Sequence, residues 1–160
     1  MTDQPGRHAF RSACPADAPA VARLVDAAYK HYVDRIGRLP GPMTDDYAEV
    51  IRTQQVIIAE RGGVIAGVLV LAVTDEGFFI NNVAVHPSNR GTGLGKALLQ
   101  LAQTEARRAG FDSLCLYTHE QMTENLSLYS RIGYVEYDRR QQRGFSRVYL
   151  RKDLQQDARP

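Results

Sequence analysis

Between Val83 and Leu99 the sequence reads VAVHPSNRGTGLGKALL. A short apolar run ends at His86-Pro87, glycines follow at positions 91, 93 and 95, and a helical apolar pattern begins at Leu94. Because proline cannot donate to a strand ladder, this order predicts a strand, a glycine-rich loop and then a helix. The first four amides of a helix lack an internal acceptor, and the helix dipole adds about half a positive charge there. The loop is therefore an expected anion site, most naturally for a phosphate or pyrophosphate.

The residues of the loop strengthen this expectation. Glycine has no Cβ atom to keep a ligand away from the backbone, and Arg90 and Lys96 add positive charge on either side. The alternative is a connection that binds nothing. Three alternating glycines would then cost roughly 0.5–1 kcal/mol each relative to alanine without a return, so we favour the ligand interpretation.

Two familiar phosphate-binding patterns fit this loop poorly. A P-loop requires G-x-x-x-x-G-K-(S/T), but Gly95-Lys96 is followed by Ala97, and Arg90 stands where the first glycine belongs. The dinucleotide pattern G-x-G-x-x-G accounts for two glycines but meets Lys96 at its last position. A different class of phosphate ligand is expected.

Composition restricts the class of protein. The chain has 160 residues, 44% of them hydrophobic, with a net charge of +2. This suits one domain, residues 1–160, with its own core, and gives no strong attraction to nucleic acid or anionic lipid. The only two cysteines, Cys14 and Cys115, lie about a hundred positions apart, so a disulfide-built secreted scaffold is not expected. No apolar run reaches membrane-spanning length and no secretory signal is visible, so we expect a cytoplasmic protein with no membrane partner. The ends, about 1–7 and 155–160, are expected to be disordered.

Helical and strand patterns alternate along the chain. Strands are expected at 8–12, 56–59, 64–74, 78–85, 113–117, 134–138 and 145–150, and helices at 17–34, 44–52, 94–109 and 118–132. The helix at 94–109 has Leu94, Leu98, Leu101 and Glu105 on one face and stops at Gly110, and a capping box of Thr118 and Gln121 is expected to open the next helix. The predicted fold class is α/β (α+β), with a mixed, mostly antiparallel twisted sheet of about seven strands and helices on both faces.

A second motif lies at Met122–Tyr134, which reads MTENLSLYSRIGY. In it, Leu128-Tyr129 lies on a helix that ends at Gly133 and is followed by an aromatic residue. The first motif, Arg90 to Gly95, follows the pattern (Q/R)-x-x-G-x-(G/A). Together the two motifs resemble the GCN5-related N-acetyltransferase (GNAT) superfamily, and the order of elements is similar from about residue 11 to residue 152.

The resemblance implies acetyl-CoA as co-substrate. The strand before the loop would hold the pantetheine arm through its backbone, the loop would hold the pyrophosphate, and Tyr129 would protonate the departing thiolate. A phenol, with an ordinary pKa of about 10, is still protonated at neutral pH and can supply that proton. A purely packing role for Tyr129 is the alternative. The residues so assigned to the cofactor are Val83, Ala84, Val85, Arg90, Gly91, Thr92, Gly93, Leu94, Gly95, Lys96 and Asn125.

Asn125 is assigned by position. Many relatives have an asparagine seven residues before the tyrosine, where this chain has Met122. Asn125 lies four residues before Tyr129, on the same helix face, and is the nearest substitute. An exposed asparagine at the start of a helix is the alternative interpretation.

The sequence does not identify the general base. Some relatives place a glutamate on the strand before the loop, but this chain has Asn81-Asn82 there. His119, Glu120 and a water chain that ends on a backbone carbonyl remain as candidates, and for His119 a surface or capping role is favoured. The acceptor is expected near residues 29–47, where Asp45 and Asp46 would attract an ammonium group and Arg35 a carboxylate, with helix capping the favoured role of the aspartate pair.

The predicted function is transfer of an acetyl group from acetyl-CoA to a primary amine by direct attack in a ternary complex. The alternative is a non-catalytic acyl-CoA-binding or regulatory module. The four histidines are scattered, so no metal is expected. The arginine-rich C-terminal segment is interpreted as a solvated sheet face rather than a nucleic-acid surface, and a homodimer is left open.

Overall fold

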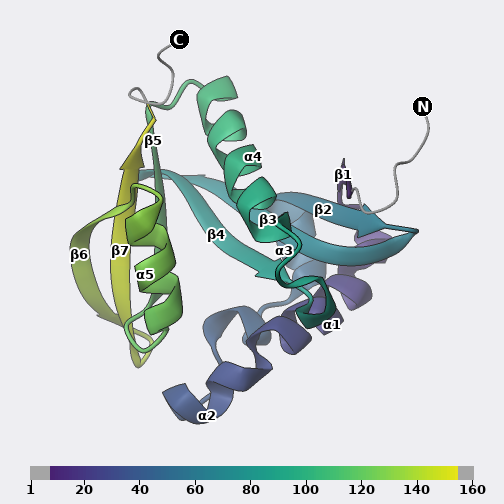
Figure 1. Ribbon diagram of the computed structural model, residues 1–160, viewed down its shortest axis with the longest axis horizontal. Helices are drawn as coiled ribbons and strands as arrows, with labels where there is room; N and C mark the ends of the chain where they lie inside the picture. The colour runs from purple at the N-terminus through teal and green to yellow at the C-terminus, as the bar shows by residue number, and fades with distance from the viewer. Residues whose placement is uncertain (1–7, 155–160) are drawn as a thin grey trace. The chain divides into compact units, whose positions relative to one another are not determined.

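The computed structural model describes residues 8–154 (Figure 1). The expectation of disordered ends falls on residues 1–7 and 155–160, outside the described residues. The described chain forms two compact units. The first contains the residues up to Leu71 together with Asn82–Leu99, and the second contains Ala72–Asn81 and the residues from Gln100 onward. The expectation of a single domain stays a prediction.

Seven strands form one mixed sheet, as the sequence predicts. Its order is β1-β2-β3-β4-β5-β7-β6. The pairs β1–β2, β2–β3, β5–β7 and β6–β7 are antiparallel, whereas β4 pairs with β5 in parallel, Phe79 opposite Cys115 and Ile80 opposite Leu116. The strands are β1 Ala9–Ser12, β2 Gln55–Arg61, β3 Val64–Thr74, β4 Gly77–Val85, β5 Ser113–His119, β6 Val135–Gln142 and β7 Phe145–Asp153.

Within the described residues, five α-helices lie in the connections between these strands. The α-helices are α1 Ala18–Tyr29, α2 Val33–Ile36, α3 Tyr47–Thr53, α4 Leu94–Arg108 and α5 Thr123–Arg131. Short 3₁₀ turns cover Pro15–Asp17, Lys30–Tyr32, Gly41–Thr44 and Pro87–Asn89. The order of elements agrees with the sequence prediction except for the additional short helix α2.

The core of the first unit lies where α1 and α3 pack on the strands. Val21, Leu24 and Val25 of α1 are at most 3% exposed and belong to one cluster with apolar residues of α3, β2, β3 and β4. Gly67 of β3 makes a close approach possible, because a Cβ atom there would lie 3.1 Å from Leu94 and Leu98 side-chain carbons and 3.2 Å from the Ala84 carbonyl oxygen. The start of α4 is therefore seated directly on β3.

The predicted helix over 17–34 is wrong as one continuous helix. The α-helix ends at Tyr29, a 3₁₀ turn follows, and α2 ends at Gly37, whose φ of +85° stops it. A 3₁₀ turn places residues three apart on one side. It lets Tyr32 become buried while the Tyr29 hydroxyl reaches Asn82 of β4. Tertiary contacts thus decide where the helix breaks.

Two further predicted features of the helices need correction. The apolar face of α4 was expected at Leu94, Leu98, Leu101 and Glu105, but the buried stripe runs through Leu94, Leu98, Ala102 and Ala106. The predicted capping box is also wrong, because Thr118 belongs to β5 and α5 begins at Thr123. The Thr118 hydroxyl instead lies 3.5 Å from the Met122 sulfur, buried at the end of the strand.

The second unit is built around β5, β7 and β6, which Figure 1 draws as neighbouring ribbons with α5 leading from β5 to β6. The last two strands run further than predicted, to Gln142 and from Phe145 to Asp153, around a tight turn at Arg143-Gly144. Polar side chains sustain this long hairpin, because arginines stack on tyrosines of neighbouring strands: Arg140 on Tyr149, Arg147 on Tyr117 and Arg151 on Tyr137. Arg140 also forms ion pairs with Glu76 and Asp138, so its guanidinium group is engaged within the second unit.

Candidate functional site

The glycine-rich loop leaves β4 through a tight turn. The His86 amide donates to the Ala66 carbonyl at 2.8 Å, and His86 Nδ1 accepts from the Ser88 amide at 3.1 Å. The Thr92 hydroxyl donates to the Asn89 carbonyl at 2.6 Å. The first of these bonds ties the turn to β3 and the other two lie within the turn, so the path of the backbone toward α4 is set by the protein itself.

Two of the three glycines are required by backbone conformation. Gly91 and Gly93 have φ of +77° and +87°, a region that residues with a Cβ atom rarely adopt. Gly95 is different, because its φ is not positive and a Cβ atom there would meet only a Val85 methyl at 3.8 Å. The protein itself therefore does not require glycine at position 95.

The start of α4 presents backbone amides. The first intrahelical bond runs from the Ala97 amide to the Gly93 carbonyl at 3.0 Å. The amides of Leu94, Gly95 and Lys96 precede that bond, where helix geometry offers no acceptor. A Cβ atom built at Gly91 or Gly93 would meet no atom within 4 Å, so the approach to this backbone is open. The donors and the open space fit a diphosphate.

The charged residues of the loop are exposed at its edges. Arg90 and Lys96 are both exposed, whereas Leu94 is buried beneath the loop. Arg90 donates from Nη2 to the Ala28 carbonyl at 3.2 Å, which ties the loop to the end of α1. The rest of its guanidinium group keeps donors for an anion.

The strand segment Val83–Val85 alternates in burial. Ala84 is buried and belongs to the core cluster, while Val83 and Val85 are half-buried. Such alternation leaves the backbone of this segment as the part that a ligand arm can pair with. The predicted pantetheine segment and the predicted pyrophosphate loop are thus consecutive pieces of the first unit.

A buried polar network that the sequence analysis did not find lies just before that segment. Asn82 is 6% exposed. The Tyr29 hydroxyl donates to Asn82 Oδ1 at 2.8 Å, and Asn82 Nδ2 donates to the Tyr47 hydroxyl oxygen at 3.2 Å. The Tyr47 hydroxyl in turn donates to the Pro42 carbonyl. A polar residue directly before an apolar Val-Ala-Val run was the signal in the sequence, but its partners were not readable there.

The direction of this network is fixed by its last member. The Pro42 carbonyl can only accept, so the Tyr47 hydroxyl must donate to it. The Tyr47 oxygen then accepts from the Asn82 amide group, which turns Asn82 Oδ1 toward Tyr29. Every bond runs one way, from Tyr29 to Pro42, and no member carries a charge.

The region expected to contact the acceptor has a mixed outcome. Asp46 caps α3, since its Oδ1 accepts from the amides of Ala48 and Glu49 at 3.1 and 3.4 Å. The favoured capping role of the aspartate pair is thus confirmed for Asp46. The Arg35 guanidinium lies over the Tyr32 ring, 5.2 Å from its centroid.

Tyr129 and Asn125 lie together on α5 in the second unit. The Tyr129 side chain is buried and meets the Tyr134 ring edge-on at 5.5 Å between centroids. Asn125 is half-buried in the first turn, and its Nδ2 lies 3.6 Å from the Met122 sulfur. Asn125 therefore contacts the residue that stands where many relatives have asparagine. All the other predicted site residues belong to the first unit.

Tyr134 has a buried hydroxyl with no hydrogen-bond partner within residues 8–154. Burial, followed by the neighbouring Tyr129 and Cys115, raises the pKa of Tyr134 well above its ordinary value. This phenol stays protonated over the whole working range of an enzyme, so it is a donor and not a base.

His119 already has a structural role. Its Nδ1 accepts from the Gln121 amide at 3.1 Å, and its ring meets Phe145 edge-on. Burial chiefly lowers the pKa of His119, with a smaller opposing effect from Glu120. In the neutral ring the proton lies on Nε2, because Nδ1 accepts from the turn. This contact does not cap α5, whose N-cap residue is Met122 and which has no side-chain cap bond.

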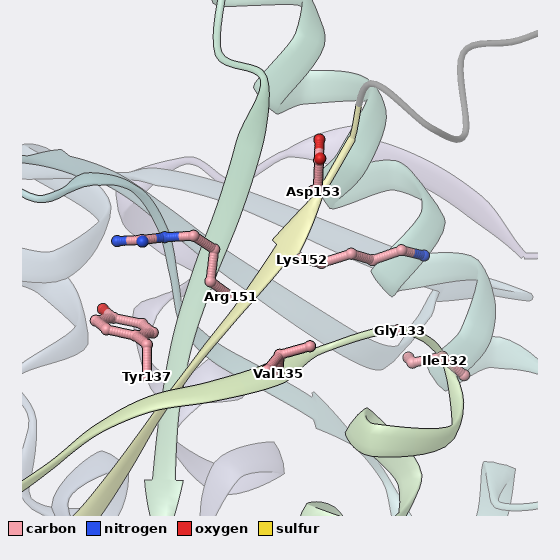
Figure 2. Close-up of a pocket in the computed structure, with 7 residues that line it drawn as sticks. All are labelled: Ile132, Gly133, Val135, Tyr137, Arg151, Lys152 and Asp153. Atoms are coloured by element: carbon pink, nitrogen blue, oxygen red, sulfur yellow. The ribbon is translucent and has the colours of Figure 1, made fainter.

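A pocket of about 500 Å³ lies beside β6 and β7 in the second unit (Figure 2). Figure 2 shows Arg151 extending toward the Tyr137 side of the pocket and Lys152 extending the opposite way. Arg151 is engaged with the Tyr137 ring and, through Nε, with the Cys115 sulfur at 3.4 Å. None of the residues that line this pocket belongs to the predicted site. They are Ile132, Gly133, Val135, Tyr137, Arg151, Lys152 and Asp153.

Neither a metal cluster nor a membrane span is found in the part of the chain that the structure describes. No three His, Cys, Asp or Glu side chains gather there in a way that would hold a metal ion. No helix there has both the length and the apolar character needed to cross a bilayer. Both cysteines are free thiols, Cys14 exposed and Cys115 buried.

Comparison with known proteins gives the family. The model of the acetyltransferase (GNAT) domain matches residues 52–136, just over half of the chain. This match begins before β2 and ends in β6, so it contains the loop, α4 and α5. The chain belongs to the GNAT acetyltransferase family.

Individual relatives agree with this assignment. An IAA acetyltransferase of Azospirillum brasilense is 30% identical over 82 residues, which are 50% of this chain and 54% of that protein. The chain therefore matches about half the length of that relative.

Two solved structures share the fold. A GNAT family acetyltransferase of Elizabethkingia anophelis with acetyl-CoA bound has a TM-score of 0.72 at 20% identity, covering 92% of this chain and 99% of that one. The PaiA N-acetyltransferase of Thermoplasma acidophilum in complex with coenzyme A has a TM-score of 0.75 at 16% identity, covering 91% and 98%.

Proposed function

We propose that the protein transfers an acetyl group from acetyl-CoA to a primary amine by direct attack in a ternary complex. The observation that carries the proposal is the glycine-rich turn into α4, where amides without helical acceptors precede the Ala97–Gly93 bond and no side chain covers Gly91 or Gly93. Membership of the GNAT family supports acetyl-CoA as the donor, and so do the coenzyme A and acetyl-CoA bound in the two similar structures.

The residues have distinct roles in this proposal. The loop from Arg90 to Lys96 holds the pyrophosphate, mainly through main-chain amides. Val83, Ala84 and Val85 pair with the pantetheine arm through their backbone, and Asn125 hydrogen-bonds to the same arm. Both reactants are held together before reaction, which supplies much of the rate by removing the entropy of encounter.

The bond changes balance as follows. The amine nitrogen attacks the thioester carbonyl carbon, the C–N bond forms, and the C–S bond breaks as the tetrahedral intermediate collapses. The nitrogen loses one proton to water. Tyr129 donates its phenolic proton to the departing thiolate and regains one from solvent. The products are the acetylated amine and coenzyme A.

Thiol release from acetyl-CoA tests the proposal. The amine panel is spermidine, tyramine, lysine and a peptide with an N-terminal alanine, which represent a polyamine, an arylalkylamine, a free amino acid and a peptide α-amine. Tyr129→Phe is expected to lower kcat about 100-fold or more while the Kd for acetyl-CoA stays the same. Tyr149→Phe is the matched control, because it also removes a phenol hydroxyl of the second unit, one that donates to Gln142. Unchanged turnover in Tyr129→Phe would exclude Tyr129 as the acid.

A non-catalytic acyl-CoA-binding or regulatory module is the second candidate. The neutral Asn82, at the place where some relatives carry a glutamate base, favours it. The same measurement separates the two. A module binds acetyl-CoA but releases no thiol with any amine of the panel, whereas an enzyme releases thiol at a rate that depends on the amine.

A further inference from the structure

The Tyr29–Asn82–Tyr47 network joins β4 to two segments that lie far from it in the sequence, the end of α1 and α3, and through Tyr47 to the turn Gly41–Thr44 that precedes α3. Asn82 is one of two buried polar side chains in the described residues. Its amide is paired on both sides, and burying it unpaired would be unfavourable. The network therefore holds these segments in one arrangement.

We propose that the network is a positioning device for the acceptor amine: through Tyr47 it fixes the turn Gly41–Thr44 against β4, at the residue that precedes Val83. The proposal rests on the proposed function, because Val83–Val85 is the segment that would hold the pantetheine arm. Asn82 and Tyr47 are positioning residues, since they act through the turn and not on the reacting atoms.

The contacts of the turn explain why it needs an outside tie. Its own bonds, Met43 amide to Pro40 carbonyl at 3.0 Å and Thr44 hydroxyl to Gly41 carbonyl at 2.7 Å, set its shape. They do not set its place in the unit. Met43 packs on the core cluster, and the Tyr47–Pro42 bond adds a polar tie to β4, because Tyr47 is itself held by Asn82. Backbone tied in this way is expected to open less often than an untied loop.

The network is unsuited to proton transfer. A side-chain amide neither gains nor loses a proton near neutral pH, so Asn82 interrupts any relay between the two phenols. Burial, followed by the carboxylate of Asp45, raises the pKa of Tyr47 well above its ordinary value. Tyr47 therefore remains a hydrogen-bond donor to Pro42 throughout the working pH range.

Three variants break different bonds of the network. Tyr47→Phe removes the donor to Pro42 and leaves the Asn82 amide group without its acceptor. Asn82→Asp keeps the shape but replaces the amide by a second acceptor, which takes the Tyr47 hydrogen away from Pro42. Tyr29→Phe removes the hydroxyl that donates to Asn82 at 2.8 Å and lies 3.4 Å from the Val83 carbonyl oxygen, but it leaves Tyr47 donating to Pro42, so it is the internal comparison.

The readouts separate positioning from general stability. Hydrogen exchange at the Met43 amide is expected to become about tenfold faster in Tyr47→Phe and Asn82→Asp, and less than about threefold faster in Tyr29→Phe. For the best amine of the panel, the KM is expected to rise about tenfold in the first two variants. The Kd for acetyl-CoA is expected to stay within about twofold of the wild type in all three. Tyr149→Phe is the control for loss of a phenol hydroxyl outside the first unit.

Several results would overturn the proposal. Met43 exchange that is the same in Tyr47→Phe as in the wild type, or fastest in Tyr29→Phe, would show that the turn is not held through Pro42. Equal losses for amine and acetyl-CoA would indicate general destabilisation. A gain of activity in Asn82→Asp would show that this position serves a base. If the wild type acetylates no amine while Met43 exchange responds as expected, the proposed function fails and the network is only a structural tie.

Discussion

The substitution Gly95→Ala tests whether the glycine at position 95 serves ligand binding or the stability of the fold. Position 95 lies in the first turn of α4, its φ is not positive, and a new Cβ atom would meet only the Val85 methyl at 3.8 Å, an ordinary contact. Alanine is favoured over glycine in a helix by about 0.5–1 kcal/mol, mostly through the unfolded chain. Because nothing in the protein opposes the methyl group, the substitution is expected to stabilise the fold by up to that amount.

The expected shift in melting temperature follows from chain size. For a protein of this length, 1 kcal/mol corresponds to roughly 2–4 °C. We therefore expect the Tm of Gly95→Ala to rise by about 1–4 °C. The affinity for acetyl-CoA is expected to fall at least about tenfold, equivalent to about 1.4 kcal/mol, because the methyl group occupies the approach to the helix amides.

Two assays on the same sample measure the effects of Gly95→Ala on stability and on affinity for acetyl-CoA. Thermal unfolding without ligand gives the stability change, and calorimetric titration with acetyl-CoA gives the Kd. Gly93→Ala is the comparison, since its φ of +87° makes alanine strained and its Tm is expected to fall instead. A more stable Gly95→Ala protein that binds acetyl-CoA as tightly as the wild type would refute the assignment of this loop to the pyrophosphate.

Two further predictions concern stability. Gly67→Ala is expected to lower the free energy of unfolding by about 1–3 kcal/mol in denaturant titration, because the new Cβ atom would lie 3.1 Å from Leu94 and 3.2 Å from a backbone oxygen; an unchanged midpoint would show that α4 can move off β3. Asp17→Asn is expected to cost roughly 1–2 kcal/mol at pH 7, since the Asp17 carboxylate accepts two bonds from Arg11 and one from the Cys14 amide. Hydrogen bonds from Arg11 chiefly lower the pKa of Asp17, so this stabilisation is present above the ordinary aspartate pKa of about 3.9 and is lost as the pH falls below it. The difference between Asp17→Asn and wild type must therefore shrink as the pH falls from about 4; a constant difference would contradict the ion-pair explanation.

Local sterics made the glycine positions of the loop and of the helix ends predictable. Gly91 and Gly93 stand at positive φ, and Gly110 and Gly133, both also at positive φ, follow the ends of α4 and α5. Such positions depend on the backbone of a few neighbouring residues, and sequence spacing records them directly. The order of strands and helices followed from the same local periodicities.

Distant partners decided the rest. The break after Tyr29, the close approach at Gly67 and the pairing of Asn82 with two tyrosines each require residues that lie well separated in the sequence to meet. The sequence contains each of these residues but not their pairing, because a hydrogen bond or a packing contact between distant segments has no spacing to reveal it. The glycine positions of the loop before α4 are thus written in the sequence, whereas the Tyr29–Asn82–Tyr47 network exists only once the chain has folded.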